Sequence, residues 1–117
     1  MANTIQNNAF LEQAAKQVLS ETIGFEESQV YYLLLTKKDS EINKEFSYSK
    51  RYRLLKSLYN LGAVGKLKPE DQDFFNYFLL PPTFLYSKNI SSKIINFLEN
   101  IYLKNHSKIL ESNFSQI

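Results

Sequence analysis

The sequence predicts a mostly α-helical domain with one small β-hairpin near its middle. Apolar residues recur at helical spacing over four stretches, which are residues 8–23, 26–36, 47–61 and 91–113. Only residues 63–80 combine turn residues with the aromatic content that favours paired strands. A chain of 117 residues has the size of one domain, so a single domain over residues 1–117 is expected.

Two N-terminal helices are predicted from capping residues and apolar spacing. Asn7 or Asn8 is expected to cap the first helix, which ends near Gly24. The second helix is expected to span residues 26–36, because acidic residues in its first turn suit the positive end of the helix dipole. This helix is apolar nearly all round, so we expect it at the centre of the core.

A short helix and a basic helix are predicted next. Ser40 is expected to cap the short helix, residues 41–46. Ser47 or Ser49 is expected to cap the basic helix, and Gly62 should end it, because Gly readily adopts the left-handed conformation that stops a helix. Four leucines form an apolar stripe along this helix, while Lys and Arg project from its other sides.

A hairpin and a long helix complete the prediction. Residues 63–68 and 73–80 flank the turn-rich, acidic sequence PEDQD, which is typical of a hairpin. The aromatic second strand is expected to be covered on both faces. Pro81-Pro82 should end it, because proline cannot donate to the ladder. The long helix is expected over residues 89–113, starting at about Asn89 or Ser91.

Basic residues are concentrated in the middle of the chain. Residues 37–68 hold nine of the 14 Lys and Arg residues but only three of the 12 acidic ones, a net charge of +6 that leaves −4 for the rest. This asymmetry favours a localised anion-binding surface. The alternative is a solvated, Lys-rich face, which charge counts alone do not exclude.

The residue inventory argues against an enzyme, a metal site or a bound cofactor. The chain has no Cys, and its one His, His106, has no Cys or acidic neighbour at ligand spacing. The carboxylates near residues 26–27 and 70–73 stand without an adjacent base or a Gly-rich phosphate loop. With no basic leader and no run of about 18 apolar residues, a cytoplasmic protein without a membrane segment is expected.

The order of the predicted elements is that of a winged helix-turn-helix with an additional helix at each end. Residues 24–82 also resemble the DNA-binding domain of the TrmB-type transcription regulators. The matching motifs are Gly24-Phe25, VYYLLL at residues 30–35, SKRYRLLKSLYNLGAV at residues 49–64, and Pro81-Pro82 after the wing. The acidic tip of the hairpin departs from a wing that contacts phosphates, because carboxylates oppose binding to the DNA backbone.

The resemblance implies double-stranded DNA as a partner. The start of such a helix reaches base edges, and flanking cations contact phosphates. The candidates near the bases are Tyr48, Ser49, Lys50 and Arg53, and the candidates for phosphate contacts are Lys37, Lys38, Lys44 and Lys56. Arg51 is a further candidate, with a place along the surface of helix 2, not facing DNA, as its alternative. Tyr52 is expected in the core, where it would continue the stripe of Leu55.

The long C-terminal helix is expected to form a homodimer. Its apolar face carries more surface than one small domain needs to cover, and the expected interface residues are Ile94, Leu98, Ile101, Tyr102 and Ile109. A hetero-partner would use the same surface. The predicted function is sequence-specific DNA binding and transcription regulation by a small dimer. The alternatives are a winged-helix protein–protein interaction module without DNA binding, and a recruiting domain whose catalytic subunit is a separate chain.

Overall fold

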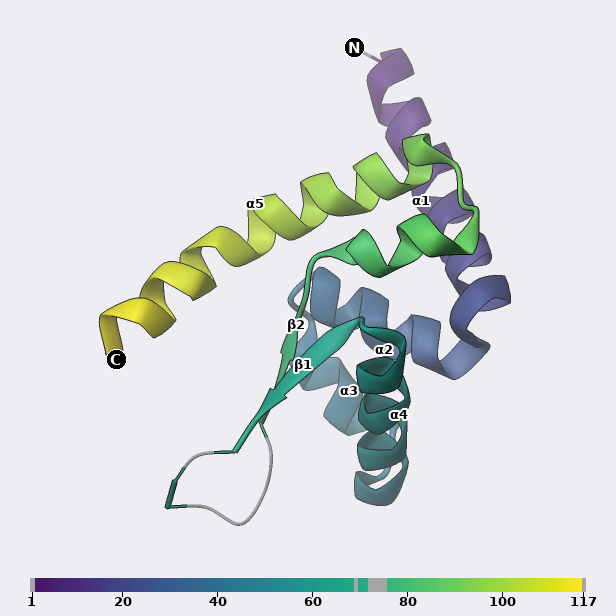
Figure 1. Cartoon of the computed structure of the whole chain (residues 1–117). Coiled ribbons are helices and arrows are strands. Elements are labelled where there is room, and N and C mark those ends of the chain that lie inside the picture. The colour runs from purple at the N-terminus through teal and green to yellow at the C-terminus, as the bar shows by residue number, and fades with distance from the viewer. Residues whose placement is uncertain (1, 69, 72–75, 117) are drawn as a thin grey trace.

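The computed structural model describes residues 2–68, 70–71 and 76–116, with the side chains of residues 2–8, 39 and 106–116 outside that description. The chain is mostly helical, and an antiparallel hairpin follows the first four helices (Figure 1). This confirms the predicted mostly α class with a small hairpin. The elements are α1 (Ala2–Ile23), α2 (Phe25–Leu35), α3 (Asp39–Glu45), α4 (Tyr48–Leu61), β1 (Val64–Leu67), β2 (Asn76–Leu79), the 3-10 helix η1 (Pro82–Lys88) and α5 (Ser92–Gln116).

Helix α2 lies at the centre of the core, as predicted. Val30, Tyr31 and Leu35 are fully buried, and α1, α3, α4 and α5 all pack against this helix. Gly24 joins α1 to α2 with a φ of 110°. Residues with a Cβ atom rarely adopt this conformation, whereas Gly adopts it readily. A single helix therefore organises the apolar contacts of nearly every other element.

The boundary between α2 and α3 differs from the prediction. Lys37 adopts a left-handed φ of 62°, and the backbone N–H of Lys38 donates to Leu33 O at 2.8 Å, which closes the end of α2. Lys38 is the N-cap of α3, so the expectation that Ser40 caps this helix is wrong. The tight turn after α2 leads directly into α3 and leaves Ser40 within its first turn.

Both ends of α4 follow local sequence signals. The Ser47 hydroxyl oxygen accepts a hydrogen bond from the Lys50 backbone N–H at 3.4 Å, which makes Ser47 the N-cap. Gly62 ends the helix with a φ of 86°. Leu54 and Leu58 are buried and hold α4 against the core. The predicted limits of the basic helix are therefore confirmed.

The hairpin is shorter and less covered than the sequence suggested. Val64 pairs with Leu79 and Lys66 pairs with Tyr77 in an antiparallel register. Exposure alternates along β2, with Phe78 exposed and Leu79 half-buried, so the expectation of a strand covered on both faces is wrong. A two-stranded hairpin has one face toward the helices, and the other face is left to solvent.

The terminal helices also differ from the sequence-based limits. Helix α1 begins at Ala2, so Asn7 and Asn8 lie within the helix and do not cap it. Leu98 and Tyr102 of α5 are buried against this chain's own core. Their assignment to a dimer interface is therefore wrong, because a side chain buried within the monomer has no surface to offer a partner. Ile109 lies outside the described side chains.

Between the hairpin and α5 the structure inserts η1, which the sequence analysis did not predict. Pro82 begins η1 and is buried, and Asn89 ends it with a left-handed φ of 58°. The Ser91 hydroxyl oxygen then accepts a hydrogen bond from the Lys93 backbone N–H at 3.2 Å, close to the predicted start of the last helix.

Candidate nucleic-acid interface

One face of α4 projects aromatic and polar side chains into solvent. Tyr48 is 76 % exposed and Tyr52 is 52 % exposed, while Ser49 and Lys56 are exposed beside them. The expectation that Tyr52 lies in the core is therefore wrong. Tyr52 precedes the buried Leu54 by two residues, which corresponds to about 200° around a helix, so the two side chains point in different directions.

Lys50 and Arg53, which are predicted to lie near the bases, form ion pairs with a residue of the same chain. The Lys50 ammonium forms an ion pair with Glu26 Oε2, and an Arg53 Nη nitrogen lies 3.9 Å from Glu26 Oε1. Glu26 belongs to the first turn of α2, so this contact joins two helices. The sequence predicts that Glu26 stabilises the start of its helix through the helix dipole. It gives no signal for the ion pairs, because the two cations lie 24 or more positions further along the chain.

Arg51 lies against α3. Its guanidinium donates a hydrogen bond to Asn43 Oδ1 and also lies 5.8 Å from the centre of the Tyr48 ring. Arg51 is half-buried by these contacts. The structure therefore places Arg51 against α3, where it connects α3 to α4.

The exposed face of α4 continues onto the hairpin. The Lys66 ammonium lies 4.4 Å from the centre of the Tyr59 ring, and Tyr77 is the cross-strand partner of Lys66. Burial raises the pKa of Tyr77, with further contributions from Tyr52 and Tyr59. We call Tyr52, Tyr59, Lys66 and Tyr77 the tyrosine cluster.

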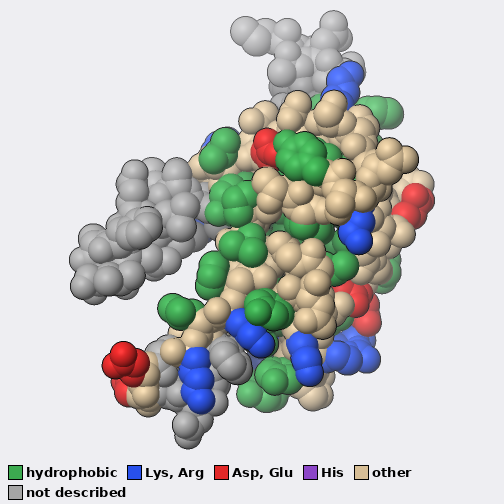
Figure 2. All heavy atoms as spheres, in the orientation of Figure 1, with side chains coloured by type: hydrophobic (Ala, Val, Ile, Leu, Met, Phe, Trp, Pro, Cys, Tyr) green, Lys and Arg blue, Asp and Glu red, His purple; other side chains and the backbone are tan. Residues whose placement is uncertain are grey.

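Figure 2 shows Lys and Arg side chains gathered over α4 and the hairpin, with hydrophobic side chains between them. Acidic side chains lie at the far end of the hairpin, where Glu70 and Asp71 are exposed. The surface is therefore basic and aromatic near α4 and acidic at the hairpin tip. Sequence reasoning did not identify the tyrosine cluster, because its members come from three elements that only the fold brings together.

The remaining predicted cations are spread over the surface. Lys44 is exposed in the last turn of α3. Lys37 and Lys38 are exposed in the turn after α2, at the opposite end of that helix from Glu26. The 11 residues of α2 span about 16 Å at 1.5 Å per residue, which separates this turn from the Lys50 and Arg53 pair.

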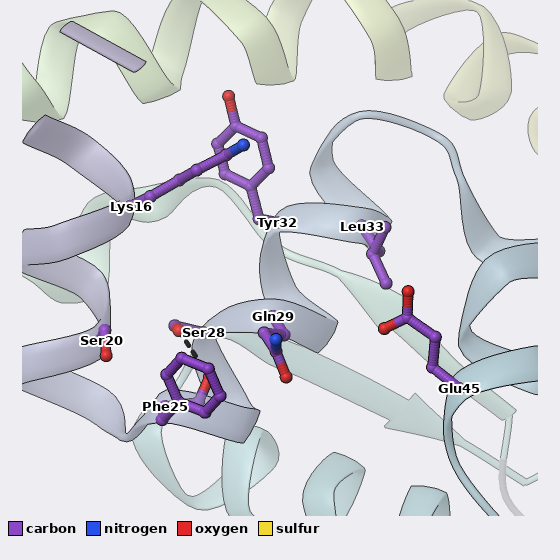
Figure 3. A pocket seen from close by; sticks show the side chains of 8 residues that line it. All are labelled: Lys16, Ser20, Phe25, Ser28, Gln29, Tyr32, Leu33 and Glu45. Atoms are coloured by element: carbon purple, nitrogen blue, oxygen red, sulfur yellow. Dashed lines mark hydrogen bonds between the residues drawn. The ribbon is translucent and has the colours of Figure 1, made fainter. Parts of the chain in front are cut away.

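A pocket of about 300 Å³ opens between α1, α2 and α3 (Figure 3). It is lined by Lys16, Ser20, Phe25, Ser28, Gln29, Tyr32, Leu33 and Glu45. Lys16 lies 5.0 Å from the centre of the Tyr32 ring, and Phe25 is 66 % exposed at the rim.

The side chains that line the pocket do not form an acid–base pair or a metal site. Burial, with a contribution from Glu12, raises the pKa of Tyr32 to about 12, so its phenol stays protonated at neutral pH. Ser28 donates its hydroxyl hydrogen to Phe25 O at 2.7 Å (Figure 3) and has no adjacent base. Within the described part of the chain, no group of three His, Asp or Glu side chains is placed to hold a metal ion.

Comparisons of this chain with protein-family models, with curated proteins and with solved structures found no match. The resemblance to TrmB-type regulators therefore stays a prediction. Across the described residues, no helix has the length and apolar character needed to cross a membrane.

Proposed function

We propose that this chain is a winged helix-turn-helix protein that binds double-stranded DNA and regulates transcription. In this assignment α3 and α4 form the helix-turn-helix, α4 is the recognition helix and the β1–β2 hairpin is the wing. The observation that carries the proposal is the exposed face of α4, where Tyr48, Ser49 and Lys56 are turned away from the core and continue onto Lys66 of the hairpin.

The dimensions of α4 suit the major groove. A helix of 14 residues is about 21 Å long, and the major groove of B-DNA, about 12 Å wide, admits a helix with its side chains. Ser49 and Tyr48 lie at the start of α4, the position from which recognition helices reach base edges. The hydroxyl of Ser49 can donate to or accept from a base, which suits direct readout.

Phosphate contacts are assigned to cations beside this face. Lys56 on α4 and Lys66 and Lys68 on or next to β1 are exposed, so each can approach the DNA backbone. The tip of the wing carries Glu70 and Asp71, which would repel phosphates. We therefore assign the wing contact to Lys66 and Lys68 on the β1 side of the hairpin and not to its tip.

We further propose that the chain acts as a homodimer through α5. Ile94 and Ile101 are half-buried along one flank of α5, and Leu103, 62 % exposed, adds apolar surface on another side of the same helix. Two-fold symmetry would present two copies of α4 to one face of a duplex, about one helical turn apart. Such an arrangement predicts an inverted-repeat site.

The first test is binding to a labelled random-sequence duplex of about 20 base pairs, at about 50 mM and about 200 mM salt. Lys56→Ala should weaken binding several-fold at the lower salt and flatten the salt dependence. Lys93→Ala is the matched control, because it removes the same charge from an exposed site at the start of α5. Failure of the native chain to bind at the lower salt would reject the proposal.

A second candidate function is protein binding without DNA binding. The observation that favours it is Phe25, 66 % exposed beside the α1–α2–α3 pocket. A partner lost on Phe25→Ser but retained on Lys56→Ala would identify the pocket as a protein-binding site. Equal capture by both variants would argue against this function.

A further inference from the structure

Lys50 and Arg53 approach the same carboxylate from successive turns of α4. Lys50 pairs with one oxygen of Glu26, and Arg53 lies 3.9 Å from the other. The cations come from the helix assigned to DNA recognition, whereas Glu26 comes from α2. Lys50 and Arg53 therefore form an anion-binding pair, and the anion that they bind is the Glu26 carboxylate of the same chain.

We propose that Lys50 and Arg53 form a binding site for a phosphate of the DNA backbone, and that Glu26 fills this site in the free protein and competes with DNA. The inference rests on the proposed DNA binding through α4. Carboxylates and phosphates accept the same charge-assisted hydrogen bonds from Lys and Arg, so a phosphodiester oxygen can take the place of the Glu26 oxygens.

The position of the pair fits a backbone contact better than a base contact. Both side chains reach toward α2, on the flank of α4, whereas Ser49 and Tyr52 occupy its exposed face. Lys50 is half-buried by its contacts and does not extend freely from the helix. A cation on the flank of a helix lying in the major groove meets the walls of the groove, where the phosphates lie. This assignment revises the expectation that Lys50 and Arg53 read bases.

The Glu26 contact is weak enough for DNA to displace. The side chains of Glu26, Lys50 and Arg53 are 35 %, 39 % and 68 % exposed, so water screens the ion pairs. Exposed pairs of this kind change an equilibrium constant by no more than about five-fold. Binding to a polyanion also releases condensed counterions, which favours exchange of the carboxylate for a phosphate.

Competition of this kind acts on every DNA sequence alike. A phosphate contact carries no base information, so loss of the Glu26 charge should tighten binding uniformly across sequences. Glu26 then sets the overall affinity for DNA, while Tyr48 and Ser49 at the start of α4 remain the candidates for sequence readout.

The test compares Glu26→Gln with Glu27→Gln. Both variants remove one negative charge from the same turn of α2, but Glu27 accepts a hydrogen bond from the neutral Ser57 hydroxyl at 3.1 Å. Affinity for a labelled random duplex should rise about two- to five-fold for Glu26→Gln relative to Glu27→Gln at about 50 mM salt. The difference should shrink at about 200 mM salt, because the pairs are exposed.

A second comparison shows whether Glu26 acts through the two cations. In a Lys50→Ala/Arg53→Ala background, Glu26→Gln should tighten binding no more than Glu27→Gln does. Glu26→Asp keeps the charge at the helix N-terminus but shortens its reach, so it should give an intermediate gain in affinity. This variant also keeps the test informative where Glu26→Gln weakens folding.

The outcomes separate the two proposals. Glu26→Gln and Glu27→Gln could bind DNA with equal affinity, at or above that of the native chain. This result would overturn the competition by Glu26 but would still support DNA binding. A gain that persists in the Lys50→Ala/Arg53→Ala background would also overturn it. Absence of binding by the native chain and by every variant at the lower salt would overturn the proposed function itself.

Discussion

The ring of Phe84, on η1, meets the ring of Tyr31, on α2, edge to face, with centroids 5.5 Å apart and planes at 82°. This contact fixes the segment that follows the hairpin against the central helix. The Tyr31 side chain is fully buried, and its hydroxyl has no hydrogen-bond partner among the described residues. Burial, reinforced by Tyr102, raises the pKa of Tyr31 above its usual range.

Tyr31→Phe should leave the protein as stable or more stable. The substitution keeps the ring contact with Phe84 and removes a buried hydroxyl that lacks a partner, so the free energy of unfolding should rise by up to about 1 kcal/mol. Urea denaturation followed by circular dichroism measures the change. Phe84→Ala is the contrast, because losing the ring should lower the free energy of unfolding by about 1–3 kcal/mol. A large loss on Tyr31→Phe would mean that the hydroxyl makes a stabilising bond.

The protein should lose stability as the pH rises above 10. The pKa of Tyr32 rises from 10.0 to about 12 on folding, because burial and the Glu12 carboxylate disfavour the phenolate. The unfolded chain releases this proton before the folded protein does, so the stabilising effect is complete below pH 10 and is lost between pH 10 and about 12. Tyr32→Phe should make the loss less steep, as measured by urea denaturation at a series of pH values. An unchanged slope would contradict the assignment.

Arg51 should support folding more than DNA binding. Its hydrogen bond to Asn43 is exposed, so Arg51→Ala should lower the free energy of unfolding by about 0.5–1.5 kcal/mol. Asn43→Ala removes the same bond without changing charge, and a double-mutant cycle isolates the coupling between the two side chains. DNA affinity should fall no further for Arg51→Ala than for the control Lys93→Ala. A markedly greater loss would place Arg51 in contact with DNA.

Local signals in the sequence were sufficient to predict most of the elements. The hydroxyl of Ser47 and the left-handed Gly62 define α4, because capping depends on residues within one turn. The end of α2 was less visible, since Lys37 adopts the conformation that Gly usually supplies. The sequence did not predict η1, because the conformation of this segment depends on the burial of Pro82 and Leu85 against the core.

The candidate site was harder to predict than the elements. The exposure of Tyr48 and Ser49 follows from helical spacing, but the pairing of Glu26 with Lys50 depends on how α2 crosses α4. Helical spacing alone assigns a side chain of α4 to the solvent side or to the core side. A third possibility, an ion pair at the edge of two packed helices, needs tertiary structure to be seen.

The proposed dimer should depend on Leu103. This side chain is 62 % exposed on α5, and a charge there would be buried without a partner in a dimer. Leu103→Glu should therefore shift the sedimentation coefficient toward that of a monomer at concentrations where the native chain dimerises. Thr83→Glu, at an exposed position of η1, is the control. A native chain that sediments as a monomer at all concentrations would contradict the dimer.

Tyr52 should separate stability from DNA binding. Because the side chain is half exposed, Tyr52→Ala should change the free energy of unfolding by no more than about 0.5 kcal/mol, whereas Leu58→Ala in the core should lower it by about 2–5 kcal/mol. DNA affinity should fall several-fold for Tyr52→Ala, because the ring lies on the face of α4 assigned to the groove.

Tyr52→Phe identifies which part of the side chain matters. The variant keeps the ring and removes the hydroxyl, so a loss equal to that of Tyr52→Ala would assign the effect to a hydrogen bond with DNA. Retention of native affinity by Tyr52→Phe would assign it to packing of the ring. If Tyr52→Ala binds as tightly as the native chain while Lys56→Ala binds weakly, the duplex contacts the Lys56 edge of α4 and the tyrosine cluster lies outside the interface.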